Sequence, residues 1–121
     1  MKILIVEDEA IIALLVEQVL VTLGHEVMTV ARTAGMAFDI ARRSTPDLAL
    51  LDIRLAGGSG VEVARWLKQR GVPSIFMTAS LIEAEANRDA VLGCISKPFT
   101  DRDVERAVRW AETRQGACAV A

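Results

Sequence analysis

The chain has 121 residues, of which 52% are hydrophobic and 25% are charged, and its formal net charge is −2. These values predict a single folded domain and exclude a disordered chain or a charged linker. The small negative charge and the scattered basic residues do not indicate direct nucleic-acid binding. The longest apolar run, Ala10 to Val16, is far shorter than the roughly 18 residues of a membrane-spanning helix. We therefore expect a protein that does not enter membranes and works in the cytoplasm.

The first part of the chain predicts two strands separated by one helix. Lys2 to Val6 is a β-branched apolar run that stops at acidic residues, which indicates a buried strand. A helical pattern extends from about Glu9 to Leu23, and Gly24 follows it at the usual position of a C-cap. His25 to Val30 alternates enough to predict a second strand.

The middle of the chain continues this alternation. Thr33 is a candidate N-cap for a helix that ends near Arg43. Leu48 to Leu51 predicts a third strand, which ends at Asp52. Three glycines between Ala56 and Gly60 predict a flexible loop. Because they follow the third strand and not the first, they match no nucleotide-binding fingerprint.

The last part of the chain predicts two more strands and three helices. These are a helix from Val61 to Arg70, a strand from Pro73 to Thr78, a short acidic helix around Glu83 to Arg88, a strand from Val91 to Ser96, and a helix capped by Thr100 that ends near Arg114. We expect residues 1–114 to form the domain and residues 115–121 to be a frayed tail. The fivefold alternation predicts an α/β fold, with a parallel, doubly wound sheet and helices on both faces.

Polar side chains stand at the ends of four of the five predicted strands. Glu7 and Asp8 follow the first strand, Asp52 ends the third, Thr78 ends the fourth, and Lys97 follows the fifth. In doubly wound folds, ligands bind beyond the carboxyl ends of the strands, which lie at one edge of the sheet. The sequence therefore predicts that three carboxylates, a hydroxyl and an ammonium group gather there.

Such a group of side chains indicates metal-assisted phosphate chemistry. Clustered carboxylates repel one another, and a divalent cation with oxygen ligands relieves that repulsion. A site without His or Cys favours Mg²⁺ or Mn²⁺ over Zn²⁺. Mg²⁺ commonly acts beside a phosphate, and a carboxylate can become an acyl phosphate. Lys97 and the Thr78 hydroxyl would then supply positive charge and a donor to the phosphoryl oxygens.

Four short motifs carry a resemblance to a known family. They are Ile3-Leu4-Ile5-Val6-Glu7-Asp8-Glu9, Leu51-Asp52-Ile53, Met77-Thr78-Ala79 and Ser96-Lys97-Pro98-Phe99. In this order and at this spacing they resemble the CheY-like receiver domain of response regulators in two-component signalling, over residues 1 to about 114. The resemblance implies a flavodoxin-like (βα)5 fold with strand order 2-1-3-4-5, and a phosphoprotein that carries an aspartyl phosphate.

The resemblance also implies which residues hold the metal. Asp52 is the expected phosphoacceptor and a ligand of Mg²⁺, with Mn²⁺ as the alternative metal. Glu7 and Asp8 are the expected acidic pair of the metal site, one of them acting through water. Arg54, two residues beyond Asp52, would add its backbone carbonyl.

The remaining implied roles concern the phosphoryl group and its donor. The Thr78 hydroxyl and the Ala79 N–H would bind phosphoryl oxygens, Lys97 would pair with the acceptor or the phosphate, and the bond before Pro98 would be cis. A histidine kinase or a histidine phosphotransfer protein would donate the group, as in a phosphorelay, and self-catalysed hydrolysis would remove it. The domain would be a switch for an unknown downstream protein and not an enzyme. It would act as a monomer or as a phosphorylation-dependent dimer.

The chain departs from the family three residues before Lys97. Receivers commonly carry there an aromatic residue that moves inward with the Thr. This chain has Cys94 at that switch position, which the family couples to the residue at Thr78. A cysteine cannot cover the same surface or present a phenolic tip, so we expect the coupling to work differently here. We also expect Cys94 to be a small buried residue. The spacing of Cys94 and Cys118 indicates free thiols and no metal site. His25, the only histidine, is expected to be structural.

The first predicted helix carries two apolar stripes. The stripe expected to meet the sheet consists of Ile12, Leu15, Val16, Val19, Leu20 and Leu23. A second stripe of Ile11, Leu14 and Val21 is expected to stay partly exposed. It suits docking of a kinase or phosphotransfer helix, and ordinary scatter of apolar surface residues is the alternative.

Several interpretations of the whole protein stay open. A stand-alone regulator is the simplest, and a receiver cut from a hybrid histidine kinase or a transcriptional regulator has the same sequence features. A small phosphohydrolase with an aspartyl nucleophile shares the metal chemistry, but it usually needs a substrate-covering insert. A flavodoxin-like cofactor binder shares the topology, but it needs a phosphate-binding loop where this chain has Glu7-Asp8-Glu9.

Overall fold

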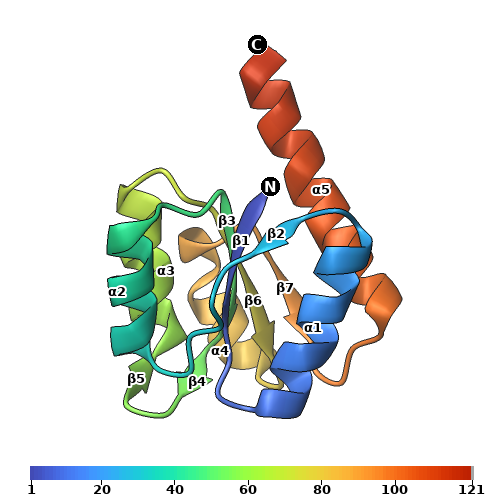
Figure 1. The fold of residues 1–121 in the computed structure, drawn as a ribbon. Coiled ribbons are helices and arrows are strands. Elements are labelled where there is room, and N and C mark those ends of the chain that lie inside the picture. Colours follow the sequence, from blue (N-terminus) through green and yellow to red (C-terminus); the bar gives the residue numbers. More distant parts are fainter. Residues whose placement is uncertain (121) are drawn as a thin grey trace.

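Five parallel strands form the central sheet, in the order β2-β1-β3-β6-β7 (Figure 1). The strands are β1 (Lys2–Val6), β2 (Glu26–Val27), β3 (Leu48–Asp52), β6 (Ser74–Thr78) and β7 (Gly93–Ser96). Numbered within this sheet alone, the order is 2-1-3-4-5, which confirms the prediction. This computed structural model describes the backbone of residues 1–120 and the side chains of residues 1–114.

Helices cover both faces of the sheet, so the domain has three layers (Figure 1). The helices are α1 (Ala10–Thr22), α2 (Ala34–Arg43), α3 (Gly60–Gln69), α4 (Leu81–Ala86), the 3-10 helix η1 (Arg88–Ala90) and α5 (Asp101–Val120). α1 and α5 pack on one face, whereas α2, α3 and α4 pack on the other. Within the described backbone, none of these helices has the length and apolar character needed to cross a membrane.

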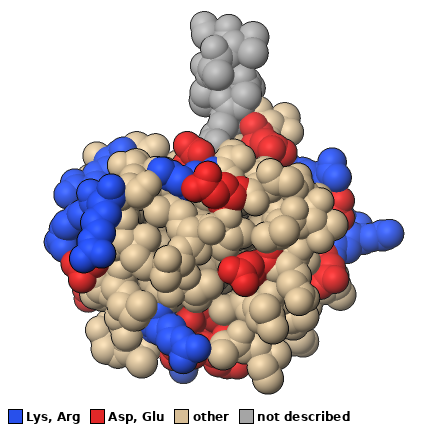
Figure 2. All heavy atoms as spheres, in the orientation of Figure 1, with Lys and Arg blue, Asp and Glu red and all other residues tan. Residues whose placement is uncertain are grey.

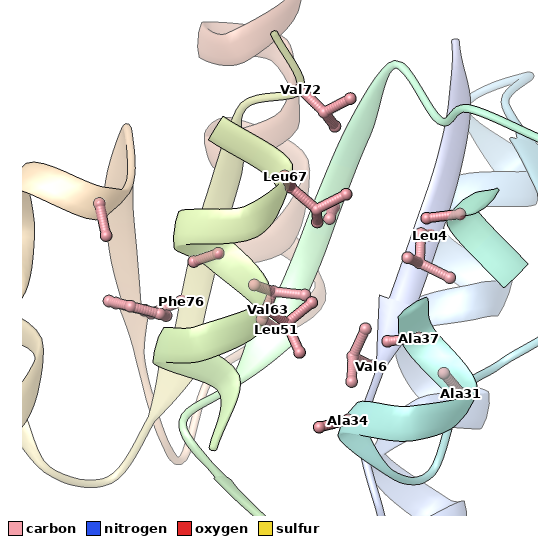
Figure 3. Close-up of a cluster of buried hydrophobic side chains, with 14 of the residues drawn as sticks. Leu4, Val6, Ala31, Ala34, Ala37, Leu51, Val63, Leu67, Val72 and Phe76 are labelled. Carbon is pink, nitrogen blue, oxygen red and sulfur yellow. The ribbon is translucent and has the colours of Figure 1, made fainter. Parts of the chain in front are cut away.

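The central strands are buried on both faces because the helices cover both. Ile3 and Ile5 of β1 belong to the core under α1 and α5, whereas Leu4 and Val6 belong to the core under α2 and α3. Figure 3 shows the second of these cores, where Phe76 of β6 also packs. Consecutive strand residues point to opposite faces, so an unbroken apolar run fills both cores.

Side-chain caps determine where several helices begin. Thr33 Oγ1 accepts a hydrogen bond from Met36 N at 3.1 Å, which confirms the predicted cap of α2. At α5, Thr100 Oγ1 accepts from Asp103 N at 3.2 Å, and Asp103 Oδ2 accepts from Thr100 N at 2.9 Å. This reciprocal pair resembles a capping box and confirms the second predicted cap. The backbone of α5 continues to Val120, past its expected end near Arg114. The side chains of the expected tail, 115–121, lie outside the part that is described.

Two predicted segments were wrong in detail. The second strand covers only Glu26–Val27, and pairing with β1 resumes at a single bridge between Val6 and Ala31. The predicted loop from Ala56 to Gly60 contains β5 (Gly58–Ser59), which pairs antiparallel with β4 (Arg54–Leu55). Gly57, with φ of 72°, gives the chain the left-handed conformation that this tight hairpin needs.

The prediction of which residues of α1 face the sheet was wrong for one residue. Leu15 was expected to meet the sheet, but it is 47% exposed. α1 buries Val16 and Leu20, as predicted, together with Ala13, which was not predicted, and these three recur every three or four residues. Leu15 lies outside this line and lines a cavity together with Asp101 and Glu105 of α5.

The surface of the face shown in Figure 2 has mixed charge. Acidic and basic side chains are separated by uncharged atoms over most of this face. Basic side chains gather in one cluster, on the side where α2 lies in Figure 1.

Candidate functional site

The predicted site residues come together at the carboxyl edge of the sheet. Asp52 and Thr78 end the neighbouring strands β3 and β6, Glu7 and Asp8 follow β1, and Lys97 follows β7. A cavity of about 670 Å³ opens at this edge. It is lined by Asp8, Glu9, Asp52, Arg54, Thr78, Ala79, Ser80, Leu81, Ile82 and Lys97.

Lys97 connects two of the carboxylates. Its Nζ donates to Glu7 Oε1 at 2.7 Å and to Asp52 Oδ2 at 2.9 Å. The Glu7 side chain has no exposed surface, and the side chains of Asp52 and Lys97 are only 10% and 13% exposed. Charge-assisted hydrogen bonds of this kind are among the strongest that a protein makes. Lys97 therefore neutralises part of the negative charge of the site.

Glu7, Asp8 and Asp52 form a cluster of oxygen ligands. One carboxylate oxygen from each lies within 4.8 Å of the others, a spacing at which one cation can contact all three. Oxygen donors alone fit a hard cation such as Mg²⁺ or Mn²⁺. The donor set therefore agrees with the metal site that the sequence predicts.

The surroundings shift the pKa values of two groups in the site. Burial raises the pKa of Glu7 to about 7, and the charge of Asp52 adds to this, although the hydrogen bond from Lys97 opposes it. For Lys97, burial lowers the pKa, but the hydrogen bonds to Glu7 and Asp52 outweigh burial and leave the pKa above its usual value. Lys97 thus stays charged, whereas the pKa of Glu7 is raised mainly by its burial.

The backbone around Asp52 holds its carboxylate in place. Arg54 N donates to Asp52 Oδ1 at 3.3 Å, so each oxygen of Asp52 has a donor from the protein. Immediately after the β4–β5 hairpin, Gly60 N donates to Ile53 O at 2.8 Å. This hydrogen bond brings the start of α3 back against the end of β3.

Thr78 lies beside Asp52 and is 2% exposed. Its Oγ1 accepts a hydrogen bond from Ser80 N at 3.0 Å, and its carbonyl oxygen accepts from Lys97 N at 2.9 Å. Thr78 is therefore in contact with the segment that carries Lys97 and with the start of α4. The peptide bond between Lys97 and Pro98 is cis, as predicted.

Residues 3–109 match the family described as the response regulator receiver domain. The chain belongs to this family. Receiver domains act in two-component signalling, and they generally bind Mg²⁺ through acidic residues and are not classical enzymes. The family assignment and the observed fold confirm the resemblance that the four motifs carry.

The chain covers most of some similar proteins and less than half of another. The phyllosphere-induced regulator PhyR of Methylorubrum extorquens is 41% identical over 116 residues, which cover 91% of this chain and 43% of PhyR. The polar-differentiation response regulator DivK of Brucella ovis is 37% identical over 107 residues, which cover 82% of this chain and 85% of DivK. The crystal structure of TrrA from Thermotoga maritima in complex with Mg²⁺-BeF is 27% identical, with a TM-score of 0.81, and covers 91% of this chain and 97% of TrrA. The chain thus spans less than half the length of PhyR.

In this receiver, the prediction that Cys94 is buried was wrong. Cys94 was expected to be buried, but it is exposed, because β7 is the edge strand of the sheet. It lines a cavity between β7 and α5, together with Trp110. Partial burial raises the pKa of the Cys94 thiol. Cys118 lies among the residues whose side chains are not described.

The receiver exposes the second stripe of α1, as predicted. Ile11, Leu14 and Val21 are 76%, 52% and 59% exposed. Leu81 and Ile82, at the start of α4, are also exposed and line the cavity beside Asp52. Apolar surface therefore lies beside the receiver site as well as on α1, and docking through α1 stays a prediction.

Two residues near the site were missing from the predictions. Ser80 Oγ accepts from Glu83 N at 3.3 Å and caps α4, and the Glu83 carboxylate pairs with Arg54. The sequence carried a signal for the first contact, because Ser80-Leu81-Ile82-Glu83 has the spacing of a capping box. No local pattern indicates the second contact, because Arg54 and Glu83 are 29 residues apart.

Proposed function

We propose that this receiver accepts a phosphoryl group on Asp52 and uses the resulting aspartyl phosphate to control binding of a partner protein. One observation carries the proposal. The Asp52 carboxylate is held by Lys97 at 2.9 Å, next to the clustered oxygens of Glu7 and Asp8, and it faces an open cavity. A carboxylate in this setting has charge compensation on one side and room for a phosphoryl group on the other.

The proposed step transfers the phosphoryl group from a phosphohistidine to Asp52. An oxygen of the Asp52 carboxylate forms a bond to phosphorus while the bond between phosphorus and the donor imidazole nitrogen breaks. The imidazole nitrogen leaves with the electron pair and takes up a proton from water, so the donor histidine is released as a neutral imidazole. Lys97, the hydroxyl of Thr78 and the N–H of Ala79 would bind the phosphoryl oxygens. Rotation of Thr78 toward the new group would release Ser80 N, its present partner.

The residues that would hold a cation are Glu7, Asp8 and Asp52, with the backbone carbonyl of Arg54. Mg²⁺ or Mn²⁺ there would offset the repulsion between carboxylate and phosphate. The Mg²⁺-BeF complex of the related TrrA supports this choice of metal. For this chain, the three carboxylate oxygens within 4.8 Å supply the matching donors.

The proposed partners follow from the same chemistry. The donor is a histidine kinase or a histidine phosphotransfer protein, and the downstream protein distinguishes the phosphorylated from the unphosphorylated form. We keep a stand-alone regulator in the cytoplasm as the predicted form. The chain covers 85% of DivK but only 43% of PhyR, and the proposed form is the one in which the receiver makes up most of the protein.

Intact mass after incubation with acetyl phosphate tests the proposal. The natural chain should gain one phosphoryl group in the presence of Mg²⁺ and none after chelation of the metal. Asp52→Asn should gain none. Asp39→Asn, which changes an exposed aspartate on α2, should be labelled like the natural chain. Labelling that persists in Asp52→Asn, or no labelling of the natural chain, would contradict the proposal.

A further inference from the structure

Two arginines meet at one tryptophan where α2 packs beside α3. The central guanidinium carbon of Arg70 lies 3.9 Å from the ring centre of Trp66, and that of Arg42 lies 5.6 Å from it. Arg42 also lies 5.8 Å from the ring centre of Phe38. Phe38 packs edge-on against Trp66, with ring centres 5.2 Å apart. The two aromatic rings therefore hold two like charges near each other through cation–π contacts.

The positive charge of these arginines is largely unbalanced. Arg42 contacts one carboxylate, Asp39 Oδ1 at 3.3 Å, and the side chains of this ion pair are 56% and 68% exposed. Among the side chains that the structure describes, Arg70 and the exposed Arg43 have no ion-pair or hydrogen-bond partner. The basic cluster of Figure 2 lies on this side of the domain. Exposed guanidinium donors are therefore available here to an anion.

Stacking on the rings prepares these arginines to bind such an anion. A guanidinium group stacks through its flat face, so the N–H groups along its edge stay available to a carboxylate. Contact with the rings also restricts two long side chains before a partner arrives, which lowers the entropy that binding costs. A position near the C-terminal end of a helix stabilises a cation by itself. It does not require that two arginines meet at one ring.

The surroundings favour a short acidic peptide over a long polyanion. At physiological ionic strength, charges are screened beyond about 8 Å, so the arginines act locally. The whole chain carries a net charge of −2, and Figure 2 shows acidic side chains close to the basic cluster. A nucleic acid strand or an anionic membrane would meet these as well. In an extended peptide, alternate side chains point to the same side about 7 Å apart, so two carboxylates can reach Arg42 and Arg70.

These arginines lie at the edge of the sheet opposite Asp52. α2 ends at Arg43 before β3 begins, and α3 ends at Gln69 before β6 begins. Both helix ends therefore lie where the strands start, whereas Asp52 lies where β3 ends. A strand of 5 residues such as β3 spans about 17 Å, so a partner at this edge leaves the cavity beside Asp52 open. We propose that Arg42 and Arg70 bind an acidic segment of a partner protein at this edge.

Calorimetric titration with a synthetic peptide tests this inference. The probe is a capped peptide in which glutamates alternate with serines, and the same peptide with glutamines is its control. The natural chain should bind the acidic peptide and not the control. Arg42→Gln and Arg70→Gln should each weaken binding about three- to tenfold, and the double variant should lose most of it. Asp39→Asn should strengthen binding about twofold, because Asp39 competes for Arg42.

Arg114 on α5 provides a matched control. It stacks on Trp110 at 4.7 Å, and no second arginine among the described side chains contacts that ring. Arg114→Gln should leave the affinity for the peptide unchanged. NMR gives a second readout through the indole N–H of Trp66, which is assigned by its loss in Trp66→Phe. This signal should shift when the acidic peptide is added, whereas the signal of Trp110 should not.

Several outcomes would overturn the inference. These are equal affinities of the natural chain and the double variant, an equal loss in Arg114→Gln, and an unchanged Trp66 signal. Tighter binding of short single-stranded DNA or of phosphatidylserine vesicles through the same arginines would overturn the choice of partner. Treatment with acetyl phosphate and Mg²⁺ should leave the affinity unchanged, and a changed affinity would contradict binding at a separate edge. The peptide test needs no phosphorylation, so its failure would leave the proposed function intact.

Discussion

A Cβ atom on Gly60 would lie 1.9 Å from the backbone oxygen of Asp52 and 2.8 Å from its carbonyl carbon. Both neighbours are backbone atoms, so no side-chain rotation relieves the contact. The hydrogen bond from Gly60 N to Ile53 O holds the two segments together at this point. The first residue of α3 therefore has to be glycine if the Asp52 carboxylate is to keep its position.

Gly60→Ala should destabilise the domain. Overpacking of a close contact costs about 1–3 kcal/mol, and we expect the upper end of this range because backbone has to move. Gly35→Ala is the control, because a Cβ there meets only Thr33 Oγ1 at 3.9 Å and the residue is helical. It should be neutral or stabilising by about 0.5–1 kcal/mol. Urea unfolding of both variants measures the difference, and equal stability would contradict the close contact.

Asp8→Asn should weaken binding of the divalent cation. It removes one charge and one strong ligand oxygen from the cluster of Glu7, Asp8 and Asp52, so the affinity for Mg²⁺ and Mn²⁺ should fall by about tenfold or more. Isothermal titration of the unphosphorylated chain measures this directly. Glu9→Gln removes the same charge from a neighbouring residue outside the cluster and should have a smaller effect. Similar losses for both variants would indicate general electrostatics and no defined site.

Ile11→Glu combined with Leu14→Glu should block transfer from a protein donor. Both side chains are more than half exposed, so the charges should leave the fold intact. Labelling by acetyl phosphate should be unchanged, whereas transfer from a phosphorylated histidine kinase or phosphotransfer protein should fall by about tenfold or more, as for loss of an interface anchor. Met36→Glu, at a 40% exposed site on α2, is the control. Normal transfer to the double variant would rule out docking through α1.

His25 should make the domain less stable in acid. Burial and the N-terminal ammonium group lower the pKa of His25 from its usual 6.5, despite the charge of Glu112. The unfolded chain therefore takes up this proton at a higher pH than the folded chain does. The stability contributed by neutral His25 is complete above pH 6.5 and is lost as the pH falls below it, by at most about 1.4 kcal/mol per pH unit.

His25→Asn isolates this effect, because it keeps a hydrogen-bond acceptor near Met1 N and does not titrate. Chemical unfolding at pH 8 and pH 5 gives the stability of the natural chain relative to the variant. The relative stability of the natural chain should be greater at pH 8 than at pH 5. The same difference at both pH values would show that His25 does not titrate differently on folding.

Most of the fold and the location of the site could be predicted because both depend on local patterns. Apolar runs and caps such as Thr33 and Thr100 define the alternating strands and helices. The β4–β5 hairpin was missed because its two-residue strands are too short for any periodic pattern. Exposure of Leu15 and Cys94 was missed because it depends on which side of α1 faces the sheet and on which strand lies at the edge of the sheet.

The sequence by itself determined that this protein is an α/β receiver with its polar groups at one edge of the sheet. The physical reason is that parallel strands bring their carboxyl ends, and the residues just beyond them, to the same side. Only the tertiary structure decided which of those groups touch. Lys97 reaches Glu7 across 90 residues of sequence, and Arg54 reaches Glu83 across 29. Such contacts depend on the packing of whole layers, which fixes distances that no local pattern encodes.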